Sequence, residues 1–225
     1  MKKIIIAIDG PAAAGKSTTA KLTAEKLNYL HVDTGAMYRA LTLKVIEEQI
    51  DPEKEELVCS VIKDCKIKLE KTDFGNQVFL DGRNITETIR SREVTRNVSA
   101  ISSYASVRKL MVEEQRKLCK QGGVVLEGRD IGTVVVPKAE LKIFMVASIE
   151  ERVRRRQKEL ADKGTNIDYE KLVNEIIERD AKDSKRTESP LRKAEDAIIL
   201  DTSNLTINQQ VEFIVAKASE IIDHK

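Results

Sequence analysis

The sequence predicts an α/β fold with a five-stranded parallel sheet flanked by helices. Short apolar runs rich in branched side chains alternate with stretches whose apolar residues recur at helical spacing. Strands that alternate with helices favour a parallel sheet covered on both faces. Most of the apolar runs end in a polar residue or a glycine, and in such sheets ligands gather beyond the carboxyl ends of the strands. We therefore expect the functional site at that edge of the sheet.

The first strand and the first helix are expected at the start of the chain. Residues 4–8 are continuously apolar and are followed by a polar residue and a glycine, which is typical of a short buried strand. Between residues 16 and 27, Ala20, Ala24 and Leu27 fall on one face of a helix. The chain thus opens with a strand, a loop and a helix.

Four further segments resemble buried strands, because each is short, apolar and followed by a polar residue. They span residues 30–32, 124–126, 141–147 and 197–200. The last helix has a well-marked start, since Thr206 and Gln209 form the pattern of a capping box. Its apolar stripe consists of Ile207, Val211, Ile214, Val215, Ala218, Ile221 and Ile222.

The pattern changes in two places. Residues 66–70 and 77–81 alternate like half-exposed antiparallel strands around a turn-rich segment at 73–76. We interpret residues 62–100 as a small antiparallel insertion carried by the α/β core. Residues 152–192 are helical in pattern and dense in charge. Three consecutive arginines at 154–156 belong either to a solvated helix face or to a binding site.

Composition and charge narrow the classes of partner. The net charge is only +2, and no run of aromatic and basic residues resembles a base-stacking platform, so we expect no nucleic-acid partner. The apolar start is interrupted by Asp9, and no later run could span a bilayer, so we expect a cytoplasmic protein without membrane contact. The three cysteines lack metal-site spacing and are expected to be reduced thiols.

The loop after the first predicted strand carries the most informative motif. It fits the Walker A pattern G-x-x-x-x-G-K-[ST], in which backbone N–H groups and a helix N-terminus surround phosphate groups. Lys16 would reach the β- and γ-phosphates, and the Ser17 hydroxyl would ligate Mg²⁺. The motif predicts binding of a nucleoside triphosphate. The expected ATP contacts are Gly10, Pro11, Ala12, Ala13, Ala14, Gly15, Lys16, Ser17 and Thr18.

A phosphate loop alone permits kinases, GTPase switches and ATPase machines. The D-x-x-G and N-K-x-D elements that GTPases need are absent from the chain, and ATPase machines are usually longer. Arg39 and Arg129 each follow a predicted strand, which favours a second anion site and phosphoryl transfer between two small anionic molecules. Two alternatives stay open: a kinase for another small acceptor, and a regulatory protein that holds ATP without turnover.

The segments around these arginines resemble the bacterial cytidylate kinases, a family of nucleoside monophosphate kinases with a phosphate-loop core. The blocks Asp-Thr-Gly-Ala-Met-Tyr-Arg and Glu-Gly-Arg-Asp-Ile-Gly-Thr-Val-Val are far more specific than the Walker A pattern. The similar segments are residues 8–17, 33–39, 89–90, 94–99, 127–135 and 178–180, with Asp183 and Arg186.

The resemblance implies transfer of the γ-phosphoryl group of ATP to CMP or dCMP, with Mg²⁺ required, in pyrimidine nucleotide metabolism. It implies a discontinuous core of residues 1–61, 101–151 and 186–225 and a monophosphate-binding insertion of residues 62–100. Residues 152–185 would form a short helical lid, from which an arginine closes on the ATP phosphates. We expect a monomer.

The resemblance also implies a role for each candidate side chain. The CMP phosphate is expected on Arg39, Arg129 and Arg186, which form the catalytic set with Lys16. The sugar hydroxyls are expected on Arg179 and Asp183. The base and the pocket wall are expected on Thr34, Tyr38, Ser99, Arg108 and Asp130. The family often has serine where Thr34 stands, and either hydroxyl can donate a hydrogen bond.

The chemistry of cytosine agrees with the expected base pocket. Cytosine offers an amino donor at N4 and acceptors at O2 and N3, which suit an aspartate acceptor beside serine and arginine donors. Uracil would turn a carbonyl toward Asp130 and leave two acceptors facing each other, at a cost on the order of 1–3 kcal/mol. We therefore predict that CMP is preferred over UMP.

Overall fold

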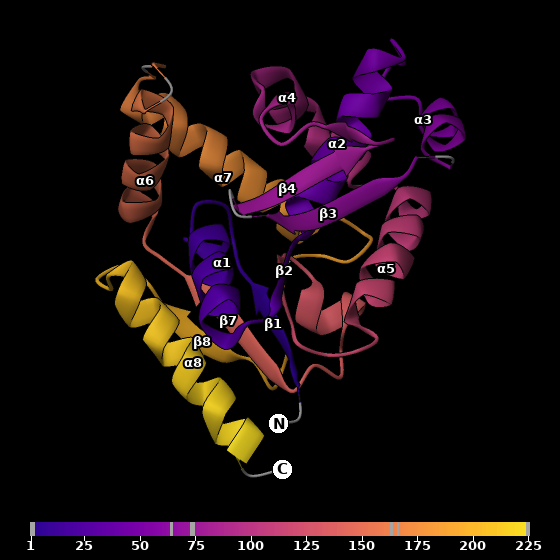
Figure 1. The fold of residues 1–225 in the computed structure, drawn as a ribbon. Helices are drawn as coiled ribbons and strands as arrows, with labels where there is room; N and C mark the ends of the chain where they lie inside the picture. Colours follow the sequence, from indigo (N-terminus) through magenta and orange to yellow (C-terminus); the bar gives the residue numbers. More distant parts are fainter. Residues whose placement is uncertain (1–2, 64, 73–74, 163, 166, 224–225) are drawn as a thin grey trace. The chain divides into compact units, whose positions relative to one another are not determined.

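The computed structural model describes residues 3–63, 65–72, 75–162, 164–165 and 167–223 (Figure 1). The chain divides into two compact units, and we describe each by itself. Unit 1 comprises Met1–His31 and Gln121–Lys225, and unit 2 comprises Val32–Lys120. Residues 32–61 and 101–120, which the sequence groups with the core, fall in unit 2. The functional boundaries at 62–100 and 152–185 stay predictions.

A five-stranded sheet forms the centre of unit 1 and confirms the predicted fold class. Its strand order is β2-β6-β1-β7-β8, and the boundary between the units falls within β2, after His31. β1 pairs in parallel with β6 and β7, and β7 pairs in parallel with β8. The strands are β1 (Ile5–Asp9), β2 (Leu30–Asp33), β6 (Val124–Gly128), β7 (Leu141–Val146) and β8 (Ile198–Asp201).

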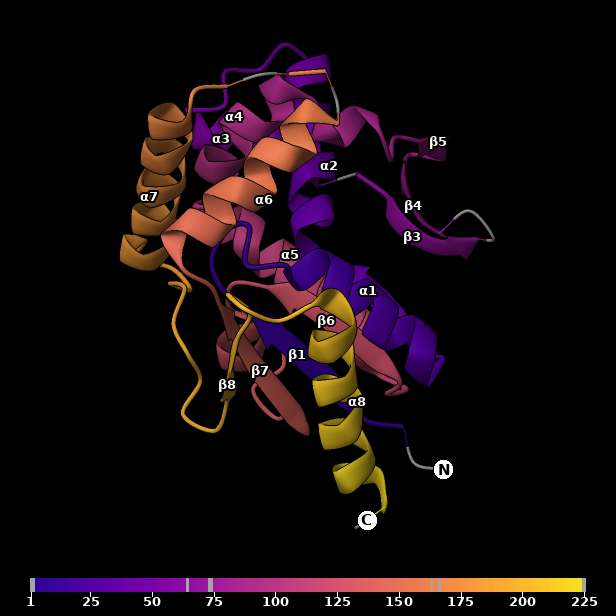
Figure 2. The ribbon, with the colours of Figure 1, turned by 90° about the vertical axis from the view of Figure 1, so that its left-hand side faces the viewer.

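The helices of unit 1 cover this sheet and bury its apolar side chains. α1 and α8 pack against each other, and α6 lies beside α7 (Figure 2). Ile6, Ile8, Ile143 and Met145 lie at the centre of the core, with Ile214 of α8 against them. The elements are α1 (Lys16–Leu27), a π-helix (Ile131–Val135), α6 (Ile149–Ala161), α7 (Tyr169–Lys185) and α8 (Ile207–Asp223).

The predicted capping box stands at the start of α8. The backbone N–H of Thr206 donates to Gln209 Oε1 at 2.9 Å, and the N–H of Gln209 donates to Thr206 Oγ1 at 3.3 Å. The two side chains therefore satisfy N–H groups that would otherwise lack a partner. Val211, Ile214 and Ala218 of the predicted stripe are buried.

The described residues of unit 2 form the predicted antiparallel strands and four α-helices. β4 pairs antiparallel with β3 and with β5, a two-residue strand that the sequence did not predict. Residues 73–74 of the predicted turn lie outside the described residues. Leu80 of β4 packs with Ala40 of α2 and Ile89. The elements are α2 (Thr34–Glu47), α3 (Glu55–Ile62), β3 (Ile67–Thr72), β4 (Gly75–Leu80), β5 (Arg83–Asn84), a 3-10 turn (Thr88–Arg90), α4 (Arg92–Ile101) and α5 (Ala105–Cys119).

None of the helices in the described part of the chain is both long enough and apolar enough to cross a membrane. The phosphate loop joins β1 to α1 within unit 1.

Candidate nucleotide-binding site

The phosphate loop has the backbone geometry of an anion cradle. Gly10 has φ = +151°, and a Cβ at this position would lie 2.1 Å from the carbonyl oxygen of Met145, so only glycine fits. Gly15 is the N-cap of α1, and no side chain caps the helix there. No side chain therefore occupies the first N–H groups of α1. N–H groups at a helix N-terminus that are left uncapped in this way can bind phosphate oxygens.

Lys16 folds back over this loop. Its Nζ atom donates to the carbonyl oxygen of Pro11 at 2.7 Å, and the residue is only 6% exposed. Burial and the nearby cations Arg129 and Arg179 lower the pKa of Lys16 to about 7, although Glu127 and Asp9 act in the opposite direction. The lysine is thus close to two of the arginines predicted for the acceptor site.

Ser17 belongs to a buried chain of polar contacts. Its Oγ donates to Glu127 Oε2 at 2.7 Å, and Glu127 Oε1 lies 3.0 Å from His31 Nε2. Burial alone would raise the pKa of Glu127, but the contacts with His31, Lys16 and Ser17 hold it below its usual value. Glu127 is therefore a carboxylate at the base of the phosphate loop.

The oxygen atoms of Ser17 and Glu127 suit a magnesium ion. Mg²⁺ is usually bound by one or two protein oxygens, with phosphate oxygens and water completing the octahedron. Within the described ranges, no group of three or more histidine, cysteine, aspartate or glutamate side chains forms a metal cage. The Ser17 hydroxyl and the Glu127 carboxylate are protein oxygens of this kind, 2.7 Å apart, so they fit an ion that arrives with a nucleotide.

Sequence reasoning gave no role to Glu127 and did not single out His31. Glu127 had a detectable signal, because it is an acidic residue at the carboxyl end of a buried strand. The contact with His31 had none, because it joins β2 to β6 across 96 positions of sequence and depends on the pairing of strands.

The structure brings together five of the predicted CMP-binding residues in unit 1. Arg129 Nε donates to Asp183 Oδ2 at 2.8 Å, and Arg186 Nη2 lies 3.6 Å from Asp130 Oδ1. Burial would raise the pKa of Asp183, but Arg129, Arg179 and Arg186 lower it below its usual value. Each predicted phosphate-binding arginine of this unit therefore has an aspartate counter-ion.

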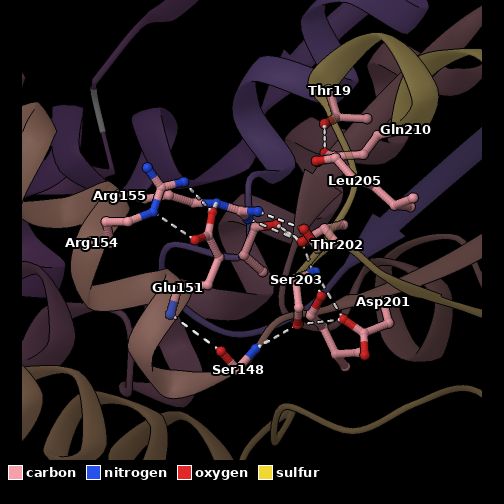
Figure 3. A network of polar contacts seen from close by, with 12 residues as sticks. Thr19, Ser148, Glu151, Arg154, Arg155, Asp201, Thr202, Ser203, Leu205 and Gln210 are labelled. Carbon is pink, nitrogen blue, oxygen red and sulfur yellow. Dashed lines mark hydrogen bonds and ion pairs between the residues drawn. The ribbon is translucent and has the colours of Figure 1, made fainter.

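The arginines of α6 divide into two kinds. Arg154 is 70% exposed in its side chain and pairs with Glu151 on the same helix, as expected of a solvated face. Arg155 points to the start of the β8–α8 connection, where it donates to Thr202 Oγ1 at 3.0 Å and to the carbonyl oxygen of Thr202 at 2.7 Å (Figure 3). Thr202 Oγ1 also donates to the carbonyl oxygen of Ala14 at 3.0 Å.

Arg152 contacts the phosphate loop directly. Its Nη1 atom donates to the carbonyl oxygen of Ala12 at 3.2 Å and to Asp180 Oδ2 at 2.5 Å. Asp180 Oδ1 in turn accepts from the N–H of Ala12 at 3.3 Å. Arg152 of α6 and Asp180 of α7 are thus both hydrogen-bonded to Ala12 of the phosphate loop.

The remaining predicted CMP residues lie in unit 2. The Arg108 guanidinium lies over the ring of Tyr38, with its Cζ atom 5.4 Å from the ring centroid. Arg108 Nη1 also donates to the carbonyl oxygen of Ser102 at 3.0 Å. Arg39 donates to the carbonyl oxygen of Ile89 at 3.2 Å and to Thr95 Oγ1 at 2.8 Å. Thr34 is the first residue of α2 and is buried, and Ser99 is half-buried on α4. Within this unit, the structure brings Tyr38 and Arg108 into contact.

Comparison with known proteins gives one consistent result. The family model described as "Cytidylate kinase" matches residues 6–220. The cytidylate kinase of Bacillus subtilis (strain 168) is 50% identical over 214 residues, which cover 95% of this chain and 96% of that protein. The cytidylate kinase of Lactococcus lactis subsp. lactis (strain IL1403) is 50% identical over 222 residues, which cover 99% of this chain and 100% of that protein.

Solved structures show the same fold at greater distance. A gluconokinase from Sinorhizobium meliloti 1021 aligns with a TM-score of 0.52 at 12% identity, over 100% of this chain and 97% of that one. At this identity the likeness concerns the fold alone. The phosphate loop, the arginine–aspartate group and the match over nearly the whole sequence lead to one assignment: the chain belongs to the cytidylate kinase family.

Proposed function

We propose that this protein is a cytidylate kinase, which transfers the γ-phosphoryl group of ATP to CMP or dCMP and forms ADP with CDP or dCDP. One observation carries the proposal from the structure. Lys16 of the phosphate loop lies close enough to Arg129 and Arg179 for these cations to lower its pKa. Cations from a donor loop and from a second anion site therefore converge, as transfer between two phosphates requires.

The phosphate loop supplies the donor site. Lys16, which donates to Pro11 in this structure, would turn its donors to the β- and γ-phosphates of ATP. An ionised phosphate favours the charged form of the lysine and offsets the effect of burial. The first N–H groups of α1 would bind the remaining phosphate oxygens, because no side chain occupies them.

Ser17 would hold Mg²⁺ through its hydroxyl oxygen, together with phosphate oxygens of ATP. Glu127, which accepts a hydrogen bond from the Ser17 hydroxyl at 2.7 Å, would orient that hydroxyl toward the ion. Bound Mg²⁺ would neutralise part of the phosphate charge. This role explains why a carboxylate is kept buried below the phosphate loop.

Arg129 and Arg186 would receive the CMP phosphate. Both are paired with aspartates here, at 2.8 Å and 3.6 Å, and an incoming phosphate would exchange one anion for another. Arginine suits this task because its planar guanidinium binds phosphate through two parallel hydrogen bonds. The acceptor phosphate is already an anion at neutral pH, so the reaction needs no general base.

The other roles in the CMP site follow the sequence expectation. Arg39 would be the third arginine on the phosphate, and Arg179 and Asp183 would bind the sugar. The cytosine base would be read by Ser99, Arg108 and Asp130. Thr34 and Tyr38 would complete the pocket.

The family resemblance also suggests roles for two segments of the chain, a location in the cell and an oligomeric state. We propose that residues 62–100 bind the monophosphate, that residues 152–185 act as the lid, and that the protein is a cytoplasmic monomer. Cys59, Cys65 and Cys119 are not joined by a disulfide in the described residues, which is consistent with a reducing compartment.

A coupled ADP-release assay tests the proposal. Mg-ATP is supplied with CMP, dCMP, UMP, AMP, GMP or shikimate, and the panel is repeated with Asp130→Ala and with the control Asp51→Asn. Strong turnover of CMP and dCMP, weak turnover of UMP and loss of that preference only in Asp130→Ala support the proposal. Turnover of another acceptor would overturn the cytosine pocket, and ATP binding without any turnover would favour a regulatory protein.

A further inference from the structure

Asp9 is a buried carboxylate that the proposed chemistry does not use. It is the last residue of β1, stands directly before the phosphate loop and is 5% exposed. Oδ1 accepts a hydrogen bond from the N–H of Ile131 at 2.8 Å, and Oδ2 accepts one from the N–H of Gly132 at 2.7 Å. Both oxygens are thus bound to consecutive backbone groups 122 and 123 positions away.

The segment that Asp9 binds follows the acceptor arginine. Arg129 and Asp130 precede a π-helix that begins at Ile131. N–H groups at the start of a helix have no partner inside it, and no local side chain caps this one. Asp9 supplies the missing acceptors from another strand. π-Helices are rare and occur mostly as single turns, frequently at functional sites.

The carboxylate is retained at some energetic cost. Burial raises the pKa of Asp9 to about 6, even though the two backbone N–H groups and Lys16 favour the ionised form. The preceding Ile8 is fully buried and apolar, as is usual for this strand. A charged group in such a place implies a task that an apolar side chain could not perform.

We infer that Asp9 is a positioning residue, which fixes the phosphate loop and the Arg129–Asp130 segment relative to each other. The inference rests on the proposed function, because it treats the first as the donor loop and the second as the acceptor loop. Two hydrogen bonds to one planar group set both distance and direction. In-line transfer depends on this alignment, and a displacement of about 1 Å can reduce the rate by about a hundredfold.

The variant Asp9→Asn tests the inference. Its amide has the same shape but keeps one acceptor and places an NH₂ group against the second N–H. We expect the single-turnover rate at saturating Mg-ATP and CMP to fall by about tenfold to a hundredfold. Dissociation constants of ATP and of CMP, each measured alone by calorimetry, should stay within about threefold, because each loop keeps its own ligands. Asp51→Asn, which alters an exposed aspartate that accepts the N–H of Glu53, should leave all three quantities unchanged.

The outcomes separate this inference from a structural role and from the proposed function. An unchanged single-turnover rate overturns the inference. A loss of affinity for both ATP and CMP that matches the loss of rate also overturns it, since that pattern indicates that the whole site is disordered. Asp9→Ala, which adds no donor, carries the same test if Asp9→Asn does not fold. Failure of the wild-type protein to phosphorylate CMP would instead reject the proposed function.

Discussion

Buried charged side chains surround the phosphate loop at the scale of single residues. Asp9, Lys16 and Glu127 are each at most 6% exposed. Each is stabilised by polar partners: Asp9 by two backbone N–H groups, Lys16 by a carbonyl oxygen, and Glu127 by a histidine and a serine. Buried charges are tolerated when they are paired in this way, and they destabilise when one partner is removed.

Replacing His31 should show this dependence. His31→Leu leaves Glu127 Oε1 without the histidine contact, and we expect the free energy of unfolding to fall by about 1–3 kcal/mol. His31→Gln, whose amide can donate to the same oxygen, should recover part of the loss. Denaturant unfolding of the three proteins measures the difference, and equal stability of the leucine and glutamine variants would contradict the expectation.

Asp9 should also make stability depend on pH. Its pKa in the folded protein, about 6, is above the ordinary value of 3.8. The folded state then binds the proton more tightly than the unfolded state, so this contribution is fully present below pH 4 and is lost as the pH rises through 6. The stability of wild type relative to Asp9→Asn should fall by about 3 kcal/mol over that window. Denaturant unfolding of both proteins between pH 4 and pH 7 measures this difference in the free energy of unfolding. A difference that does not change with pH would contradict the raised pKa of Asp9.

Single contacts across the chain were the least predictable feature of the site. The motif at 10–17 predicts roles for Lys16 and Ser17 from the local sequence alone, and these roles stay predictions. The partners of Asp9 and Glu127 were not predictable, since they depend on which strands pair and in which register. Their roles, and those of the CMP-binding residues, stay predictions that the variants above can test.

At the scale of elements, the sequence predicted those that a continuous or periodic pattern defines. The five core strands and the first and last helices lie where apolar runs and the capping box indicate. β5 was missed because it has only two residues, both exposed. The π-helix was missed because its bonds span five residues and its side chains show no helical period.

The phosphate loop makes a steric prediction at this scale. Gly10→Ala places a methyl group 2.1 Å from the carbonyl oxygen of Met145, so we expect the loop to shift and ATP binding to be lost. Gly82→Ala is the matched control, because Gly82 also has a positive φ, +83°, but no atom within 4 Å of the added Cβ. The control should lose only about 1–2 kcal/mol of stability and keep ATP binding. Calorimetry with ATP and thermal unfolding compare the two, and ATP binding by Gly10→Ala would contradict the steric argument.

At the scale of the whole molecule, the chain divides into two compact units, and the expected core, insertion and lid segments stay predictions. Unit 2 extends the expected insertion on both sides and includes α2 and α5. The pattern of alternating residues revealed the small sheet but not the helices that pack with it. Helical spacing of apolar residues marks the buried face of a helix but does not say which distant helix packs against that face.

Substrate binding should reveal which segments act as functional parts. We expect residues 62–100 and 152–185 to gain protection from hydrogen exchange when a bisubstrate analogue is bound, because closure would exclude water from the phosphates. Exchange is measured with and without the analogue. Unchanged protection in both segments would reject the lid and insertion roles, and matching changes at 32–61 would indicate that all of unit 2 responds together.

The pairing of Arg129 with Asp183 and of Arg186 with Asp130 also bears on inhibitor design. In the proposed CMP site, a neutral substitute for the phosphate would separate these largely buried pairs without returning a negative charge to the arginines. A carboxylate or sulfonate would return it through two parallel hydrogen bonds. Useful compounds should therefore keep one permanent anion and obtain their selectivity from the group that replaces cytosine.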